Sequence, residues 1–539
     1  MKTKIYFLIL LIFGLFSCSD LDQMNRDPNR PTADMYDFSR SQISTMLRAG
    51  STYNGADMYQ RVKNLHIDLY SQMFDEVPSG WTNTRNYFSN DGWTISYWNS
   101  VPSWVSQLNT IIKEGTVDPN RVNTVAVTRI WRVYIQSQAT DLFGVMPFPS
   151  YKTYVANPPY VSVQNQYAEF FTELDEASKS FDDTKGFLNS SEDMIFNGDI
   201  AKWKKFANSL RLRLALRVSE VDVNTAKTQA QAAITAGVME TEADEAKCPP
   251  SNKGWGNDYN YTLLFNWGET QHMTTSFEKL VTNIGGIAWP ATVGATVKPA
   301  KVDPRAVVMF DPSTDGTWKG VPPGLHPNDV NQTPNKKTEI AVLGVKTVGV
   351  DGARNITRKY DLMLFEEVCF LKAEAALRGF TSGGDAKSEY EKGVTASFTR
   401  WGVSGAATYL TSNEKNGAGT SANFSDNSGA GNTQLEKIIT QKYIASFPDV
   451  SIEAWADKRR LNLPRFDVPV YRDPVVFGSA PTSITDPRSF MKRVKIPDTE
   501  AINNTVEYNK GVLLMGAGGD RTNTNLWWDT NANFCTSPN

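Results

Sequence analysis

The stretch from residue 81 to residue 93 brings aromatic rings and hydrogen-bonding side chains close together in the sequence. Its members that could contact a ligand are Trp81, Asn83, Arg85, Tyr87, Asp91 and Trp93. Aromatic rings pack against flat C–H surfaces, while amide, carboxylate and guanidinium groups hydrogen-bond hydroxyls. Sugars present both kinds of surface, so this stretch predicts a carbohydrate-binding site. Gly80 and Gly92 flank it and indicate that it forms a loop.

Two further tryptophans, Trp289 and Trp318, lie in a segment from 248 to 358 that is rich in Gly, Pro, Asn and Thr. No helical periodicity runs through this segment, so we expect long loops with short strands between two helical halves. Because long loops in a compact protein are usually functional, Trp289 and Trp318 are also candidate ligand-binding residues. The alternative for every one of these rings is that it fills core beneath the loops.

The sequence offers little for catalysis or metal binding. It contains only 3 His residues, and it lacks an HExxH motif, a CxxC pair, a GxSxG elbow and a Walker loop. Two carboxylates would suffice for glycoside hydrolysis, but among 58 acidic residues a chance pair is always available. We therefore expect no catalytic residue, no metal ligand and no cofactor. Calcium stays an alternative, since the Asp- and Asn-rich stretch 86–91 offers oxygen ligands without an EF-hand pattern.

The N-terminus has the pattern of a secretory signal. Lys2 and Lys4 precede an apolar run from Ile5 to Phe16, which is too short to span a bilayer. The run ends in Leu15-Phe16-Ser17-Cys18, which resembles a bacterial lipobox, although Phe16 departs from the usual residue. The resemblance implies a signal peptide at 1–17, lipid on Cys18 and an acylated tether at 18–35. An ordinary signal with an incidental Cys is the alternative.

The rest of the chain has globular composition and a helical pattern. Hydrophobic residues make up 40%, and the net charge of -3 argues against nucleic-acid binding. Apolar residues at helical spacing predict helices over 39–49, 57–74, 104–112, 123–143, 164–181, 201–218, 226–234, 360–379, 385–401, 433–447 and 451–460. Four tryptophans on these apolar stripes are predicted to pack in the core: Trp131, Trp203, Trp401 and Trp455.

This pattern predicts a mostly α fold of paired helices similar to tetratricopeptide repeats. We expect one domain from 36 to 539, with a helical scaffold at 36–240 and 360–460. The loop-rich insert at 248–358 separates the two parts of the scaffold. The tail at 461–539 contains six prolines up to Pro497 and is expected to be irregular.

Four segments in this order resemble those of SusD/RagB-type lipoproteins. They are Asp27-Pro28-Asn29-Arg30-Pro31-Thr32, the run ATDLFGVMP at 139–147, the run EEVCFLKAEAALRG at 366–379, and IEAWADKRR at 452–460 followed by Pro464. Val145 stands where that family often has Asp. The resemblance covers most of the chain and is nearest the second SusD-like subgroup.

The resemblance implies eight helices in four tetratricopeptide-like units, and a ligand site built from the loop after the early helices and from the insert. It also implies an outer membrane lipoprotein of Bacteroidetes that faces outward, as the acidic Asp20 and Asp22 behind Cys18 suggest. Such a protein binds a nutrient, most often a glycan, and works with a SusC-like TonB-dependent transporter. The alternatives are a surface glycoside hydrolase and a peptide-binding or adhesive surface lipoprotein.

Overall fold

The structure is a computed structural model of the 539-residue chain. It describes residues 38–531 apart from 52–57, 77–83, 87–89, 154, 156, 187–191, 251–270, 327, 345–346, 348–356, 382–383 and 471–489.

Helices dominate the described chain and pack as antiparallel neighbours. The longer ones are α3 (Phe38–Ser51), α6 (Asp91–Thr116), α7 (Val122–Phe143), α8 (Val163–Ser180), α9 (Ile200–Arg217), α10 (Val223–Ala236), α15 (Phe365–Leu377), α16 (Ala386–Arg400), α18 (Gln434–Ala445) and α19 (Ser451–Leu461). Helices α6 to α10 pack each against the next, and α15 packs against α16 and α18. The predicted mostly α fold of paired helices is confirmed.

Polar residues at the helix starts explain where several helices begin. The side chains of Ser162, Asp199 and Asp222 accept hydrogen bonds from backbone N–H groups in the first turns of α8, α9 and α10. Thr433 and Glu436 form a reciprocal capping box at α18. These side chains satisfy N–H groups that have no partner inside the helix, so the local sequence defines the helix boundary.

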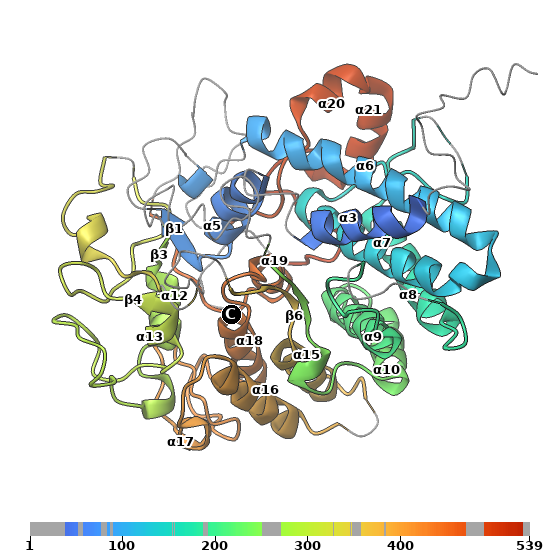
Figure 1. The fold of residues 1–539 in the computed structure, drawn as a ribbon. Coiled ribbons are helices and arrows are strands. Elements are labelled where there is room, and N and C mark those ends of the chain that lie inside the picture. Colours follow the sequence, from blue (N-terminus) through green and yellow to red (C-terminus); the bar gives the residue numbers. More distant parts are fainter. Residues whose placement is uncertain are drawn as a thin grey trace, which may run out of the picture.

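The insert between the helical halves contains short strands and short helices. Its elements are β2 (Ala246–Cys248), β3 (Gln271–Met273), α12 (Thr275–Val281), α13 (Ala306–Met309), β4 (Phe310–Asp311) and β5 (Val342–Leu343). A small sheet has the strand order β1-β3-β5-β4, with β1 (Phe74–Glu76) contributed by the N-terminal half. Strand β2 pairs with β6 (Tyr360–Met363), which directly precedes α15. Figure 1 shows β3, β4, α12 and α13 on the side of the molecule away from α8, α9 and α10.

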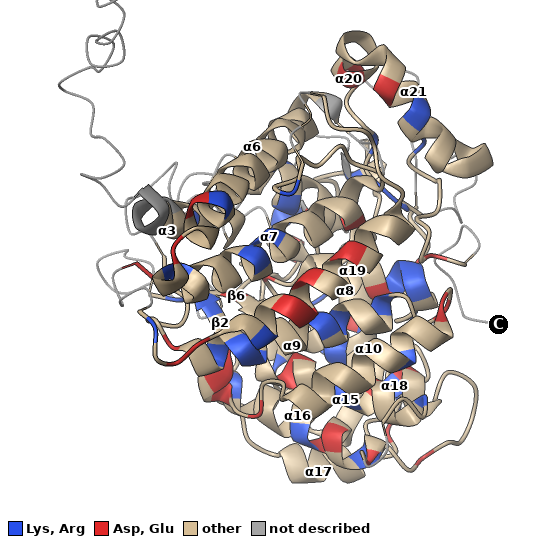
Figure 2. Ribbon diagram, turned by 90° about the vertical axis from the view of Figure 1, so that its right-hand side faces the viewer, with Lys and Arg blue, Asp and Glu red and all other residues tan. Residues whose placement is uncertain are grey.

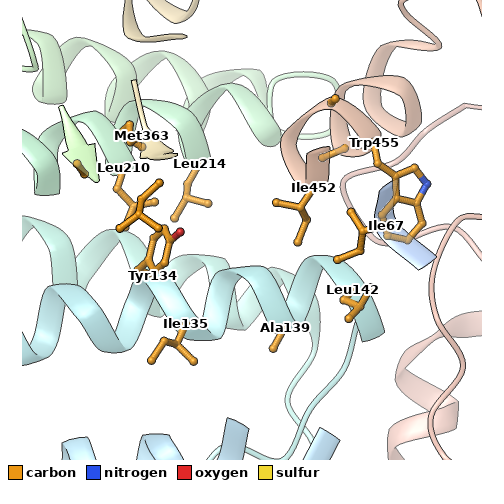
Figure 3. Packing of buried hydrophobic residues seen from close by; sticks show 14 of the residues in the cluster. Ile67, Tyr134, Ile135, Ala139, Leu142, Leu210, Leu214, Met363, Ile452 and Trp455 are labelled. Atoms are coloured by element: carbon orange, nitrogen blue, oxygen red, sulfur yellow. The ribbon is translucent and has the colours of Figure 1, made fainter. Parts of the chain in front are cut away.

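The core lies where α7, α9 and α19 face one another. Figure 3 shows Tyr134 of α7 pointing toward Leu210 of α9, with Leu214 of α9 nearby, and Ile452 and Trp455 of α19 beside Ile67. Ile135 and Ala139 extend from the other side of α7, and Leu142 lies near its end. All of these side chains are buried, and together with Trp131 and Trp203 they belong to the main apolar cluster. The predicted core positions of Trp131, Trp203 and Trp455 are therefore confirmed, whereas Trp401 is only partly buried against the cluster.

Buried charges connect the same helices. Arg213 and Arg217 of α9 pair with Glu367 of α15 and Glu453 of α19, and Arg460 of α19 pairs with Glu374 of α15. All six side chains are at most 5% exposed. Figure 2 shows acidic and basic residues side by side along α8, α9 and α15. Buried charges are tolerated because each one is paired with an opposite charge.

Four segments differ from the sequence expectation. Residues 360–363 of the helix expected over 360–379 form strand β6, so the helix begins only at Phe365. The helix expected over 57–74 consists of a π-helix, η1 (Tyr59–Ile67), continued by α5 (Asp68–Tyr70) and then β1. Helix α6 begins at Asp91 rather than 104 and continues through Pro102, because the buried side chains Trp98, Val101 and Val105 hold both sides of the proline in place.

The tail is the fourth difference, because it is not irregular throughout. It forms a projecting helical hairpin from α20 (Asp498–Asn503) and α21 (Thr505–Leu514), seen above α6 in Figure 1.

The remaining elements are α17 (Ala406–Thr411), η2 (Thr84–Asn86), η3 (Pro119–Arg121), η4 (Glu242–Asp244), η6 (Ile284–Gly286), η7 (Lys337–Glu339) and η8 (Gly516–Gly518). None of the helices in the described ranges combines the length and apolar character needed to cross a bilayer.

Candidate functional site

The stretch 81–93 follows β1 in the sequence, and β1 lies where the N-terminal half meets the insert. Strand β1 pairs antiparallel with β3, so that Phe74 lies opposite Met273 and Glu76 lies opposite Gln271. The pairing is anchored by Gln72, whose side-chain oxygen and backbone carbonyl accept hydrogen bonds from Ser276 and Thr274 of the insert. The two regions named as candidates therefore meet in space, although almost 200 residues separate β1 from β3.

Asn86 forms a second connection to the insert. Its side-chain Nδ2 donates to the backbone oxygens of Leu325, at 3.0 Å, and Gly324, at 3.3 Å. Asn86 is 2% exposed, so this amide is a structural link rather than a group presented to a ligand. A buried amide that bonds backbone carbonyls fixes the position of both chains. The short helix η2 is thereby held against the loop at 324–325.

Trp93 lies in the first turn of α6 and keeps part of its surface exposed. The edge-to-face contact with His66 places the two ring centroids 6.2 Å apart, with an angle of 83° between the ring planes. The N–H groups of Trp93 and Thr94 both donate to the carbonyl of Asn90, at 3.0 Å. A partly exposed indole supported from behind has the geometry of a stacking platform for a flat ligand.

His66 is fully buried in η1 and bonds at both ring nitrogens. Its Nδ1 lies 2.6 Å from the carbonyl oxygen of Arg61, and its Nε2 lies 3.2 Å from the backbone nitrogen of Asn90. A carbonyl only accepts and a backbone N–H only donates, so Nδ1 carries the proton and Nε2 is the acceptor. Burial lowers the pKa of His66 to about 4, against an opposing effect of the Arg61 hydrogen bond, which keeps the ring neutral at physiological pH.

The other members of the stretch divide between buried and undescribed positions. Arg85 is 2% exposed, with its Nε 4.0 Å from the carboxylate of Asp75 on β1, so its charge faces the strand. Asp91 is the first residue of α6, and its side chain lies outside the described part of the chain. Trp81, Asn83 and Tyr87 also lie outside the described residues. The structure thus places Trp93 partly at the surface and directs Arg85 inward.

The two tryptophans of the insert pack against each other in the core. Trp318 is 1% exposed, and its indole N–H donates to the carbonyl of Phe310 at 3.0 Å. Trp289 is 8% exposed, and its indole N–H donates to the carbonyl of Val293 at 2.8 Å. Their ring centroids are 5.3 Å apart in an edge-to-face contact. This placement favours the alternative of core packing, because neither ring offers a free face for a ligand.

The described groups of the candidate site are suited to holding a ligand. The described groups around it are the indole of Trp93, the neutral imidazole of His66 and the buried amide of Asn86. In the part of the chain that the structure describes, no three His, Cys, Asp or Glu side chains gather in an arrangement suited to a metal ion. Cys18 and the tether at 18–35 lie outside the described residues.

Sequence reasoning missed the roles of His66 and Asn86. The sequence gives no role to His66 among its 3 His residues, and it indicates for Asn86 only a possible oxygen ligand in the stretch 86–91. A signal for His66 was present in its own region, because Tyr59, Val62, Leu65 and Leu69 surround it with apolar residues. A histidine in such a setting is buried and must find partners for its two nitrogens, but the sequence does not reveal which partners.

The comparisons with known proteins agree on one family. A family model described as "SusD-like: Susd and RagB outer membrane lipoprotein" matches residues 23–529. A SusD homologue of known structure from Parabacteroides distasonis is 45% identical, covers 93% of this chain and 100% of its own, and superposes with a TM-score of 0.86.

More distant structures share the fold. A chitin-binding SusD homologue from Flavobacterium johnsoniae is 26% identical over 92% of this chain and 99% of its own, with a TM-score of 0.75. A SusD homologue from Bacteroides vulgatus is 25% identical, with the same coverage and TM-score. No curated protein matches the chain.

Proposed function

The chain belongs to the SusD and RagB family of outer membrane lipoproteins. We propose that this protein binds a glycan at the outer membrane and delivers the glycan to a SusC-like TonB-dependent transporter. SusD-like proteins are non-catalytic binding proteins, so the activity is capture of the ligand and not hydrolysis. The subgroup within the family stays a prediction.

The observation that carries the glycan proposal is the position of Trp93. Its indole is partly exposed at the start of α6, rests on the buried ring of His66, and follows directly on the ring- and amide-rich stretch that begins at Trp81. Aromatic faces of this kind stack on the C–H face of a sugar, while neighbouring amides and carboxylates bond its hydroxyls. We assign Trp81, Asn83, Tyr87, Asp91 and Trp93 to this site.

The first ligand class to test is chitin oligosaccharides. The Flavobacterium johnsoniae homologue is described as chitin-binding, and its overall fold matches with a TM-score of 0.75. N-acetylglucosamine also suits the site chemically, since its acetamido group adds an amide donor and acceptor beside a flat pyranose face. Other glycans and peptides are the alternatives that the experiment separates.

The experiment is titration calorimetry on protein that lacks residues 1–18, with chitohexaose as the first ligand and a panel of plant and host oligosaccharides after it. We expect Trp93→Ala to weaken binding about 5- to 150-fold, because stacking of a ligand ring on one aromatic side chain contributes on the order of 1–3 kcal/mol. The matched control is Trp527→Ala, which removes a partly buried tryptophan that packs against Tyr167 instead.

Each outcome decides between the alternatives. Binding that both variants retain in full would remove Trp93 from the site. A panel in which no glycan binds, together with a peptide that does, would replace the glycan by a peptide ligand. Products that appear during incubation with the wild-type protein would contradict simple capture.

The lipid anchor and the transporter require their own measurements. We propose that cleavage after Ser17 leaves an acylated Cys18, and that the tether at 18–35 connects it to the domain at 36–539. Mass spectrometry of the mature N-terminus tests the acylation, and Cys18→Ser is expected to release the protein from the membrane fraction. Co-purification of a TonB-dependent barrel with the tagged wild-type protein tests the partner, and its absence under mild detergent would contradict delivery.

A further inference from the structure

Helix α6 starts without a side-chain cap, as α7 and α15 do. Asn90 occupies the N-cap position with φ −88° and ψ 98°, but its side chain makes no capping hydrogen bond. Helices α8, α9, α10 and α18, by contrast, are each capped by the side chain of the residue before them. The backbone N–H of Asn90 instead bonds a side chain outside the helix.

His66 is the group that holds it. The Nε2 of His66 accepts the backbone N–H of Asn90 at 3.2 Å, and the carbonyl of the same residue receives the N–H groups of Trp93 and Thr94. The N–H and the carbonyl of Asn90 thus connect the imidazole to the first turn of α6. The Nδ1 of His66 is fixed in turn by the carbonyl of Arg61 within the π-helix η1. π-Helical turns are rare, and they occur frequently at functional sites.

The ring of His66 also supports the indole of Trp93 directly. It lies in edge-to-face contact with both Trp93 and Tyr70, at centroid distances of 6.2 Å and 5.9 Å. Tyr70 packs on the fully buried Trp455 of α19 at 5.4 Å. Four rings therefore form a column that runs from the core of the helical scaffold to the partly exposed indole.

We propose that His66 is a positioning residue for the glycan platform, because it bonds the backbone of Asn90 at the start of α6 and supports the ring of Trp93. This inference rests on the proposed function of Trp93. A side chain that is ordered before the ligand arrives loses less conformational entropy on binding. Loss of the support is expected to weaken binding by about 3- to 10-fold, which is the effect of one or two additional side chains that must be ordered.

The test compares two replacements of His66. His66→Leu fills the space but removes the acceptor for the Asn90 N–H, whereas His66→Gln keeps an acceptor oxygen at a similar distance from the backbone. We expect calorimetry with chitohexaose to show weaker binding for His66→Leu, with partial recovery in His66→Gln. A stability control is Val394→Ala, which opens a cavity in the separate apolar cluster around α16 and is expected to leave the Kd unchanged.

A measurement without ligand separates this inference from the proposed function. The protein labelled with 5-fluorotryptophan gives one ¹⁹F resonance per tryptophan, and the Trp93 resonance is identified by its loss in Trp93→Phe. We expect it to be narrow in the wild type and in Val394→Ala, and shifted or broadened in His66→Leu. An unchanged resonance in His66→Leu would overturn the positioning role, whatever the ligand. If the resonance changes but Trp93→Ala binds glycan normally, the positioning role stands and the glycan platform fails.

Discussion

Arg217 of α9 and Asp141 of α7 form a buried ion pair, with 2.8 Å between Nη1 and Oδ2 and no more than 3% of either side chain exposed. Arg217 also pairs with Glu453 of α19. The other carboxylate oxygen of Asp141 accepts hydrogen bonds from the hydroxyl of Tyr167 at 2.6 Å and the indole of Trp528 at 3.0 Å. One carboxylate therefore connects α7, α8, α9 and the C-terminal segment. Burial alone would lower the pKa of Arg217. The neighbouring carboxylates of Asp141 and Glu453 outweigh this effect and raise the pKa, so Arg217 stays charged.

Asp141→Asn should be strongly destabilising for this reason. The amide cannot neutralise Arg217, and removal of one partner from a buried pair costs about 3–5 kcal/mol. Urea denaturation at pH 7 measures the loss in the free energy of unfolding. The control is Glu507→Gln, which breaks the surface pair with Lys510, 2.6 Å apart, and should cost at most about 0.5 kcal/mol. Equal effects of the two substitutions would show that the buried pair has no special role in stability.

Glu173 should make the protein sensitive to acid. Burial alone would raise the pKa of Glu173. Its carboxylate accepts hydrogen bonds from Arg129 at 2.8 Å, Tyr151 at 2.7 Å and Lys152 at 3.0 Å. These bonds outweigh burial and lower the pKa from 4.5 to about 2. The folded state holds this carboxyl's proton less tightly than the unfolded state does. The stabilisation is therefore complete above pH 4.5 and is lost as the pH falls towards 2.

Glu173→Gln tests this pH dependence. Unfolding followed by circular dichroism from pH 6 to pH 2 should show a smaller loss of stability on acidification than the wild type shows. Glu176→Gln, at the more exposed carboxylate that also pairs with Arg129, should keep most of the wild-type dependence. Parallel curves for the wild type and Glu173→Gln would rule out this carboxylate as the acid-sensitive group.

Gly393 permits the close crossing of α15 and α16. A Cβ at this position would lie 2.8 Å from the ring of Phe370 and 3.1 Å from the Cβ of Cys369. Gly393→Ala should therefore destabilise the fold by about 1–3 kcal/mol through overpacking, although alanine is the better helix former by about 1 kcal/mol. Thermal unfolding measures the change, with Thr395→Ala at an exposed position of the same helix as the control. A stabilising Gly393→Ala would show that the two helices can move apart at little cost.

Trp318→Phe distinguishes core packing from ligand contact in the insert. The substitution removes the indole hydrogen bond to Phe310 and part of the packing with Trp289, so the melting temperature should fall. The affinity for glycan should not change, because Trp318 is 1% exposed. A loss of affinity as large as that of Trp93→Ala would restore Trp318 to the ligand site.

Local sequence determined the helices of the scaffold. The apolar spacing and the capping residues of α8, α9 and α18 lie within the segments themselves, and the predicted bounds agree with the structure to within two residues. The same spacing placed Trp131, Trp203 and Trp455 in the core. A helix is built from contacts three and four residues apart, so its pattern is readable without knowledge of the fold.

The tertiary structure alone decided how the candidate site is assembled. The pairing of β1 with β3, the start of α6 at Asp91 and the burial of Trp289 and Trp318 all depend on residues far apart in the chain. Nothing in the residues around Asn90 indicates that a histidine 24 positions earlier holds it. Such contacts leave no periodic pattern in the sequence, because their energy comes from surfaces that meet only when the chain has folded. The sequence thus determined which types of side chain are available for binding. Tertiary packing determined how exposed these side chains are and which residues contact them.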